Sequence, residues 1–152
     1  MEVETKFVND KARELYNGLP SYATPGAAGI DLRACIEKKV VLNPGDFHVI
    51  GTGVAMCLHN PNFGSFLYPR SGNACKFGVI LRNSVGVIDS DYQNELKACI
   101  INWGNESITI EPGERICQLV ITPIQRVIPV EVEEFSTETE RGQGGFGSTG
   151  SK

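Results

Sequence analysis

Short runs of β-branched and aromatic residues, separated by glycine, proline and asparagine, recur along most of this chain of 152 residues. Helical periodicity is nearly absent, and runs of this length and spacing are typical of an all-β sandwich or barrel. A 41% hydrophobic chain of this size can bury one core. The expected strands are residues 30–36, 39–42, 47–50, 54–58, 65–68, 79–81, 85–88, 96–102, 107–110, 116–123 and 127–133.

Two stretches predict turns of the same kind, at residues 43–46 (Asn-Pro-Gly-Asp) and 111–114 (Glu-Pro-Gly-Glu). Proline fixes the first central φ of a type II turn and glycine accepts the positive second one. One short helix is expected over residues 72–76, with Ser71 as its cap and Gly78 as its stop.

The net charge of −4 leaves no broad basic surface for DNA or RNA. No segment approaches the roughly 18 apolar residues of a membrane span, and the acidic start lacks an apolar signal core. A cytoplasmic protein is therefore expected.

The five cysteines form no CxxC pair, and their odd number and wide spacing argue against a disulfide framework or a zinc site. They are interpreted as reduced, buried small hydrophobes. A catalytic cysteine is not expected, because its base would have to be His48 or His59, and both are interpreted as strand or loop residues.

The tail divides the chain into an expected β domain, residues 1–135, and a flexible glycine-rich arm, residues 136–152. The arm has one large apolar side chain, Phe146, so it cannot bury enough apolar surface to fold alone. Its hydroxyls, backbone N–H groups and Arg141 suit a phosphate ligand, and the Phe146 ring can stack on a base. The alternative is a floppy terminus with chance glycines.

Two internal segments contain polar residues that could bind a ligand. Arg70 directly precedes the short helix, whose first N–H groups could bind an anion together with its guanidinium. The alternative is an ordinary connection between strands. Residues 83–97 predict a hairpin whose exposed backbone can pair with a planar base, with Tyr92 against a sugar and Asp89 or Asp91 holding a water. The alternative is a solvated acidic hairpin. Asn94 is expected to take the left-handed conformation of its turn.

Asp31 lies between apolar neighbours in a small-residue segment, so a structural salt bridge is at least as plausible as catalysis. Arg115 and Gln118 are an odd number of residues apart and face opposite sides of a regular strand. They can serve one site only if a bulge or a neighbouring chain intervenes.

Taken in order, five elements resemble the trimeric dUTP diphosphatase (dUTPase) family, from about residue 22 to the tail. Any one motif is weak, but five in sequence, with the rare GGFGSTG, are highly specific. The motifs are residues 28–32 with Ala34, residues 69–72, residues 86–92 closing at Asn102, residues 113–116 with Gln118, and residues 141–150. Asn73, Asn94 and Arg82 depart from the family pattern and are expected to alter loop packing, not the reaction.

The resemblance implies a distorted, jelly-roll-like β-barrel that assembles as a homotrimer. It implies Mg²⁺-assisted hydrolysis of dUTP to dUMP and pyrophosphate, which keeps uracil out of DNA and supplies dUMP for thymidylate synthesis. Each active site is expected to combine the segment around Asp89 from one chain, the arginine and glutamine elements from a second, and the tail from a third.

The resemblance also assigns roles. Asp89 would activate the water that attacks the α-phosphate, Mg²⁺ would be held by substrate phosphates and water rather than directly by the protein, and Asp31 and Arg115 would support the structure. The residues assigned to the substrate are Arg70, Ser71, Gly72, Asn83, Gly86, Val87, Ile88, Asp89, Tyr92, Lys97, Gln118, Arg141, Phe146, Gly147 and Ser148.

Two other functions stay open. A dCTP deaminase shares the fold and would release ammonia from dCTP. A non-catalytic, nucleotide-binding regulatory trimer would release no pyrophosphate from dUTP.

Overall fold

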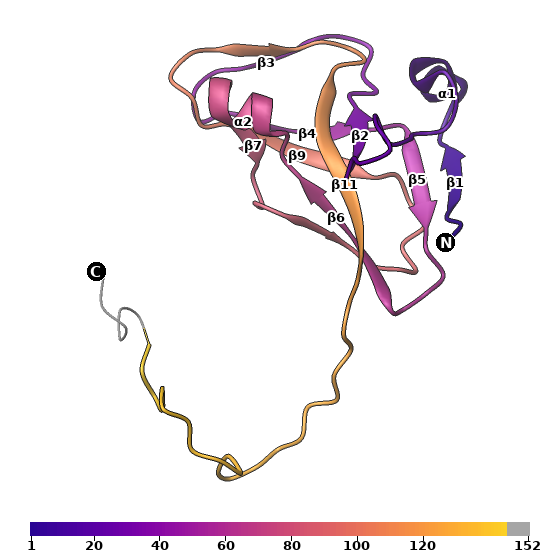
Figure 1. Cartoon of the computed structure of the whole chain (residues 1–152). Coiled ribbons are helices and arrows are strands. Elements are labelled where there is room, and N and C mark those ends of the chain that lie inside the picture. Colours follow the sequence, from indigo (N-terminus) through magenta and orange to yellow (C-terminus); the bar gives the residue numbers. More distant parts are fainter. Residues whose placement is uncertain (146–152) are drawn as a thin grey trace.

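Eleven strands and two short helices make up residues 1–145, the part of the chain that the computed structural model describes (Figure 1). Ten of the expected strands are present within a residue or a few of their predicted bounds, which confirms the all-β class. The elements are β1 (Glu4–Phe7), α1 (Asp10–Tyr16), β2 (Ile30–Arg33), β3 (Val40–Leu42), β4 (Phe47–Gly51), β5 (Val54–Cys57), β6 (Phe63–Tyr68), α2 (Ser71–Phe77), β7 (Val79–Leu81), β8 (Gly86–Ile88), β9 (Lys97–Asn102), β10 (Ile108–Ile110) and β11 (Arg115–Pro123).

The strands of residues 1–145 form four small sheets rather than one continuous closed barrel. A four-stranded sheet has the order β2-β11-β6-β8, and a three-stranded sheet has the order β4-β9-β7. The pairs β1-β5 and β10-β3 complete the body. All the pairings are antiparallel, so short connections suffice to join the strands.

The core lies between the inward faces of these sheets. Alternate residues of β9 and most inward positions of β6 and β11 are buried, as expected for strands with one face on a core. Leu67 and Leu119 face each other across the β6–β11 ladder, and both are nearly inaccessible to solvent. Burial of one such leucine stabilises the fold by roughly 1.5–3 kcal/mol.

Both predicted turns are confirmed. Gly45 and Gly113 have φ of 86° and 85°, which a residue with a Cβ rarely adopts. The turns close through the N–H groups of Asp46 and Glu114, which donate to the carbonyls of Asn43 and Glu111 at 2.9 and 3.1 Å. These turns fix where β4 and β11 begin.

The helix α1 was not predicted. The Asn9 side chain caps it by accepting from Ala12 N at 2.8 Å, and Asn17 ends it in the left-handed conformation. Only Ala12 of its seven residues is fully buried, so the helix leaves almost no periodic apolar signal. Tyr16 anchors it: its hydroxyl donates to Thr52 O and accepts from the Arg33 backbone N–H, and burial raises the pKa of this phenol.

The strand predicted over residues 127–133 is wrong for the single chain. After Pro123 the polypeptide leaves the body in an extended path (Figure 1). Ile128, Val130 and Val132 show the alternation of a strand, yet they are 89%, 77% and 57% exposed. A strand needs a ladder partner, and none of residues 1–145 supplies one to this segment.

The interpretation of the cysteines is confirmed in part. All five are free thiols, but only Cys57 and Cys117 are buried, whereas Cys75 is exposed. His48 lies in β4 and His59 in a loop, as expected. Within residues 1–145, no helix is long and apolar enough to cross a membrane.

Candidate active site

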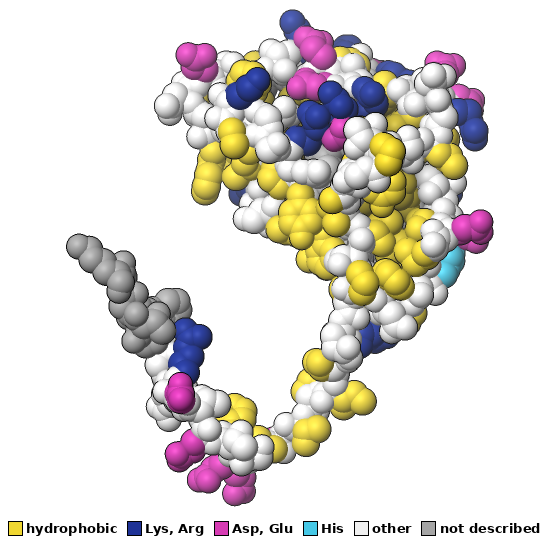
Figure 2. Space-filling view, in the orientation of Figure 1, with side chains coloured by type: hydrophobic (Ala, Val, Ile, Leu, Met, Phe, Trp, Pro, Cys, Tyr) yellow, Lys and Arg dark blue, Asp and Glu magenta, His cyan; other side chains and the backbone are white. Residues whose placement is uncertain are grey.

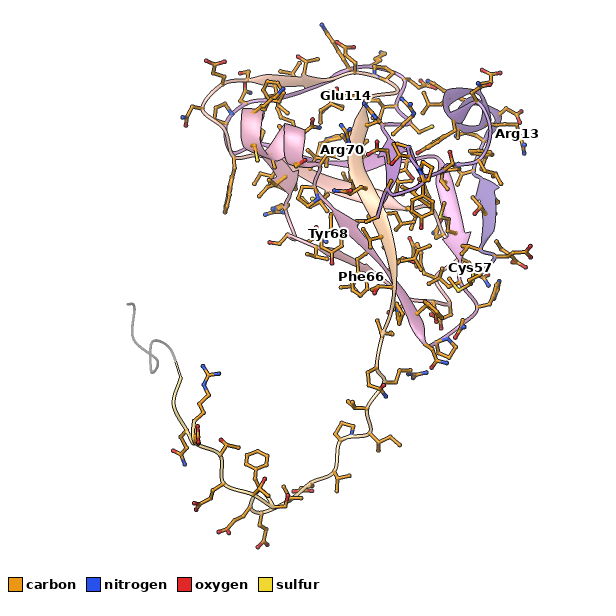
Figure 3. The ribbon with its side chains drawn as sticks, in the orientation of Figure 1. Arg13, Cys57, Phe66, Tyr68, Arg70 and Glu114 are labelled. Atoms are coloured by element: carbon orange, nitrogen blue, oxygen red, sulfur yellow. The ribbon has the colours of Figure 1, made fainter. Side chains whose placement is uncertain are left out.

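Asp31 lies between two arginines that come from different elements. Its Oδ1 accepts from Arg70 Nε at 2.8 Å, and its Oδ2 accepts from Arg115 Nη1 at 3.1 Å. A guanidinium has five N–H donors, so donors remain on both arginines for an anion. Arg70 lies beside β11 in Figure 3, and Figure 2 shows Lys and Arg side chains gathered at this end of the body. Asp31, Arg70 and Arg115, called the arginine group below, together carry two positive charges and one negative charge.

A bulge in β11 brings the side chains of Arg115 and Gln118 to the same side of the strand, near β2. Gln118 pairs with Asp31 and Cys117 with Leu32, but the register shifts between Arg115 and Cys117. The extra residue turns the strand so that both polar side chains approach β2. The sequence predicted that Arg115 and Gln118 can serve one site only if a bulge or a neighbouring chain intervenes. The bulge is present within the chain.

Gln118 links β11 to the residue before Arg70. Its Nε2 donates to Pro69 O at 3.0 Å, next to Arg70. Its Oε1 lies so close to Gly29 that a Cβ there would be 2.7 Å away. The absence of a side chain at Gly29 is therefore what admits Gln118, consistent with the close approach expected of this small-residue segment.

The helix α2 begins directly after Arg70. The expected cap was Ser71, but the N-cap position belongs to Arg70 and no side chain caps the helix. Ser71 is the first helical residue, so its N–H is among the first N–H groups, which have no partner within a helix. Gly78 ends the helix with φ of 69°, as predicted. Asn73 connects the helix to the arginine group through a bond to Arg115 O at 3.4 Å.

The predicted hairpin over residues 83–97 is wrong in its pairing. β8 pairs with β6 in the four-stranded sheet, whereas β9 pairs with β4 and β7 in the three-stranded sheet. The acidic segment 89–96 therefore crosses from one sheet to the other. The left-handed residue of this region is Ser84, with φ of 63°, and not Asn94.

The crossing segment presents polar groups at the surface. Asp89, Asp91 and Asn83 are exposed, and the Tyr92 ring is 38% exposed. The Tyr92 hydroxyl donates to Glu95 O at 3.1 Å, and its backbone N–H donates to Asp89 O at 3.2 Å. These two bonds fix the ring relative to the Asp89 backbone.

Within one chain, the Asp89 segment and the arginine group lie at opposite ends of β6. Ile88 pairs with Ser65, which puts Asp89 at the level of Gly64, whereas Arg70 lies six residues further along. At about 3.3 Å per residue, the separation is roughly 20 Å. The chain therefore presents two distinct polar surfaces rather than one closed pocket.

Two cavities in residues 1–145 lie away from both polar surfaces. One of about 640 Å³ lies between α2 and residues 104–110, and one of about 490 Å³ lies along β1 and β5. No residue assigned to the substrate lines either of them. Arg141 is exposed and donates to Gly144 O at 3.2 Å, whereas Phe146, Gly147 and Ser148 lie outside the described residues.

The three departures from the family pattern make local contacts. Asn73 bonds to Arg115 O as described above, and Asn94 Oδ1 accepts from Glu95 N at 2.7 Å. The Arg82 guanidinium lies 3.7 Å from the centre of the Phe47 ring. Sequence reasoning missed a second group of contacts, in which Cys57, Leu58 and His59 donate hydrogen bonds to the Ser90 carbonyl. These residues and Ser90 come from segments with no local motif in common.

Comparisons with known proteins agree over nearly the whole length. A family model described as dUTPase matches residues 16–150. Deoxyuridine 5'-triphosphate nucleotidohydrolase of Idiomarina loihiensis is 49% identical over 149 residues, which is 98% of this chain and 97% of that protein. The protein of the same name from Acinetobacter baylyi is 45% identical over 152 residues, with both chains fully covered.

Solved structures give the same fold. The dUTPase of Staphylococcus bacteriophage 80alpha with dUpNHpp superimposes with a TM-score of 0.85 at 30% identity, covering 98% of each chain. The dUTPase from phage phi11 of S. aureus, 24% identical, gives a TM-score of 0.77 over 90% of this chain and 99% of that one. Because the family model spans most of the chain and the relatives match it at close to half identity, the chain belongs to the dUTPase family.

Proposed function

We propose that this protein hydrolyses dUTP to dUMP and pyrophosphate. The observation that carries the proposal is near-50% identity, from end to end, to proteins named deoxyuridine 5'-triphosphate nucleotidohydrolase. A dUTPase of the same fold is known with dUpNHpp, a ligand related to dUTP. Removal of dUTP would keep uracil out of DNA, and the dUMP formed would supply thymidylate synthesis.

Asp89 is the proposed general base. Its exposed carboxylate can accept a proton from a water molecule as the water oxygen forms a bond to the α-phosphorus. The bond from the α-phosphorus to the oxygen that bridges to the β-phosphate breaks, and pyrophosphate leaves. Position and charge stabilisation supply most of the catalysis in such a transfer.

The arginine group is the proposed phosphate site. Asp31 orients Arg70 and Arg115 and lowers their combined charge, and the remaining N–H donors bind phosphate oxygens. Ser71 and Gly72 add a hydroxyl and backbone N–H groups, with open space next to Gly72. The Gln118 amide has a second N–H for phosphate besides the one on Pro69 O.

The donor set fits Mg²⁺ held mainly by the substrate. Both oxygens of Asp31 are already used by arginines, whereas Asp89 and Asp91 are exposed carboxylates that can bind waters of a hydrated ion. When bound to the triphosphate, Mg²⁺ would neutralise charge on the phosphate oxygens.

The uracil and sugar sites are assigned to the segment around Asp89. Asn83, the backbone of residues 86–88 and the backbone of Lys97 would pair with uracil, and cytosine would leave polar groups unpaired at about 1–3 kcal/mol each. The Tyr92 ring, fixed by its bond to Glu95 O, would exclude a 2′-hydroxyl. Phe146 would stack on the base, and Arg141, Gly147 and Ser148 would close over the phosphates.

The active sites are proposed to be shared among three chains of a homotrimer. A separation of about 20 Å between Asp89 and Arg70 along β6 favours a site completed by a neighbouring subunit. The exposed apolar side chains of residues 127–135 also favour assembly, because a second chain can cover them. The domain boundary near residue 135 and the cytoplasmic location remain predictions.

A nucleotide panel tests the proposal. Purified protein with Mg²⁺ should release pyrophosphate from dUTP and much less from UTP, dCTP or dTTP, and its native mass should be that of three chains. Ammonia released from dCTP would support the deaminase instead. Binding of dUTP without pyrophosphate release would support the regulatory trimer.

A further inference from the structure

Three hydrogen-bond donors from one short segment converge on the carbonyl of Ser90. Leu58 N and His59 N lie 3.1 and 3.0 Å from Ser90 O, and the Cys57 thiol donates to it at 3.4 Å. The segment lies at the end of β5, where Figure 3 labels Cys57. Two successive backbone N–H groups aimed at one oxygen form a concave binding site known as a nest. This nest holds the Ser90–Asp91 peptide group, one residue beyond Asp89.

The backbone of Asp89 is thereby held from both sides. On one side, Ile88 pairs with Ser65 in the β6–β8 ladder. On the other side, Ser90 is held by the nest, more than 30 residues away in sequence. The Asp89 carboxylate itself is exposed, so its direction depends on these backbone contacts.

The nest requires an unusual conformation at His59. Its φ is 52°, in the left-handed region that strains a residue with a Cβ. The imidazole is held at both nitrogens: Nε2 lies 2.8 Å from Glu4 Oε2, and Nδ1 lies 3.5 Å from Cys57 Sγ. Glu4 reaches this position because β1 pairs with β5, with Glu4 opposite Cys57. The imidazole contacts therefore hold the backbone that forms the nest.

The order thiol, imidazole, carboxylate is also that of a nucleophile, its base and an orienting group. A hydrolytic role would need free N–H donors for an oxyanion. The nearby N–H groups of Leu58 and His59 are already bonded to Ser90 O, so the arrangement suits positioning rather than nucleophilic catalysis.

We propose that His59, oriented by Glu4, is a positioning residue that fixes Asp89 through the Ser90 carbonyl. The inference rests on the proposed function of Asp89, and it makes β1 part of the active-site support. The effect acts mainly on the attacking water, so it should lower kcat by a larger factor than it changes KM for dUTP.

Comparison of alanine with glycine at position 59 tests the inference. His59→Ala removes the imidazole contacts and leaves a Cβ in the left-handed region, and kcat should fall about tenfold. His59→Gly removes the same contacts but adopts this φ without strain, and it should recover at least half of the wild-type kcat. Glu4→Ala should give a smaller loss than His59→Ala, and His48→Ala, on β4, is the matched control with wild-type kcat.

Hydrogen exchange of the same variants separates this inference from the proposed function. The amides of Leu58, His59 and Tyr92 should exchange faster in His59→Ala than in His59→Gly, whether or not dUTP is the substrate. Wild-type kcat and wild-type exchange in both variants, or a loss that appears in KM alone, would overturn the role of His59. A wild-type protein that does not hydrolyse dUTP but shows the expected exchange pattern would refute the proposed function and leave the support of the Ser90 carbonyl by His59 intact.

Discussion

Two inactive variants should complement each other if each active site draws Asp89 from one chain and Arg70 from its neighbour. Asp89→Asn preserves shape but removes the base, which should lower kcat by about 10²–10⁴-fold. Arg70→Ala removes a phosphate donor and one of the two arginines on Asp31. The roughly 20 Å between these residues along β6 is the structural reason to place them in different chains.

The expected recovery can be calculated from the symmetry. In a trimer assembled at random from equal amounts of the two variants, a shared site is intact when one chain carries Asp89 and the next carries Arg70. About one quarter of the sites meet this condition in a cyclic assembly. If both residues acted within one chain, no site would be intact.

Co-expression with two different affinity tags provides the mixed trimers, and pyrophosphate release from dUTP measures their activity. The control combines Asp89→Asn with the double variant Asp89→Asn, Arg70→Ala, which has the same assembly but no source of Asp89. Mixed trimers no more active than this control would refute the shared site.

Four further outcomes are expected. Gly29→Ala should displace Gln118 from Pro69 O and lower the free energy of unfolding by about 1 kcal/mol, measured by urea titration. Burial raises the pKa of Cys117 to about 12, so the unfolded thiol ionises first; stability should fall from about pH 9 upward, by at most about 1.4 kcal/mol per pH unit, and Cys117→Ala should flatten this slope. Tyr92→Ala should raise activity on UTP relative to dUTP, and an unaltered ratio would count against sugar discrimination by the ring. Truncation after Thr139 should cut activity sharply while the thermal transition and native mass stay unchanged.

Local patterns were sufficient for most of the strands and both turns. A Pro-Gly pair specifies its turn through its own φ angles, and residues 43–46 and 111–114 turn as predicted. Gly78 ends α2 for the same local reason. The sequence motifs also singled out Arg70 and Asp31, because motif order is a property of the sequence, and the structure pairs these two side chains.

The errors arose where structure depends on distant partners. The short helix α1 is stabilised by the Asn9 cap and by Tyr16 bonds to Thr52 and Arg33, not by an apolar stripe. Residues 127–133 alternate like a strand, but alternation cannot supply a ladder partner. The two sides of the predicted hairpin joined different sheets, because β6 and β4 offered the pairing edges.

The sequence by itself determined the class of fold, the turns and the residue types available for phosphate and base recognition, because these depend on neighbours within a few residues. Only the tertiary structure decided which of these residues meet. The bulge in β11 turned Arg115 and Gln118 toward Asp31, and β1 brought Glu4 to the histidine whose backbone holds Ser90. Such contacts join residues far apart in sequence, and their geometry is set by the packing of whole sheets.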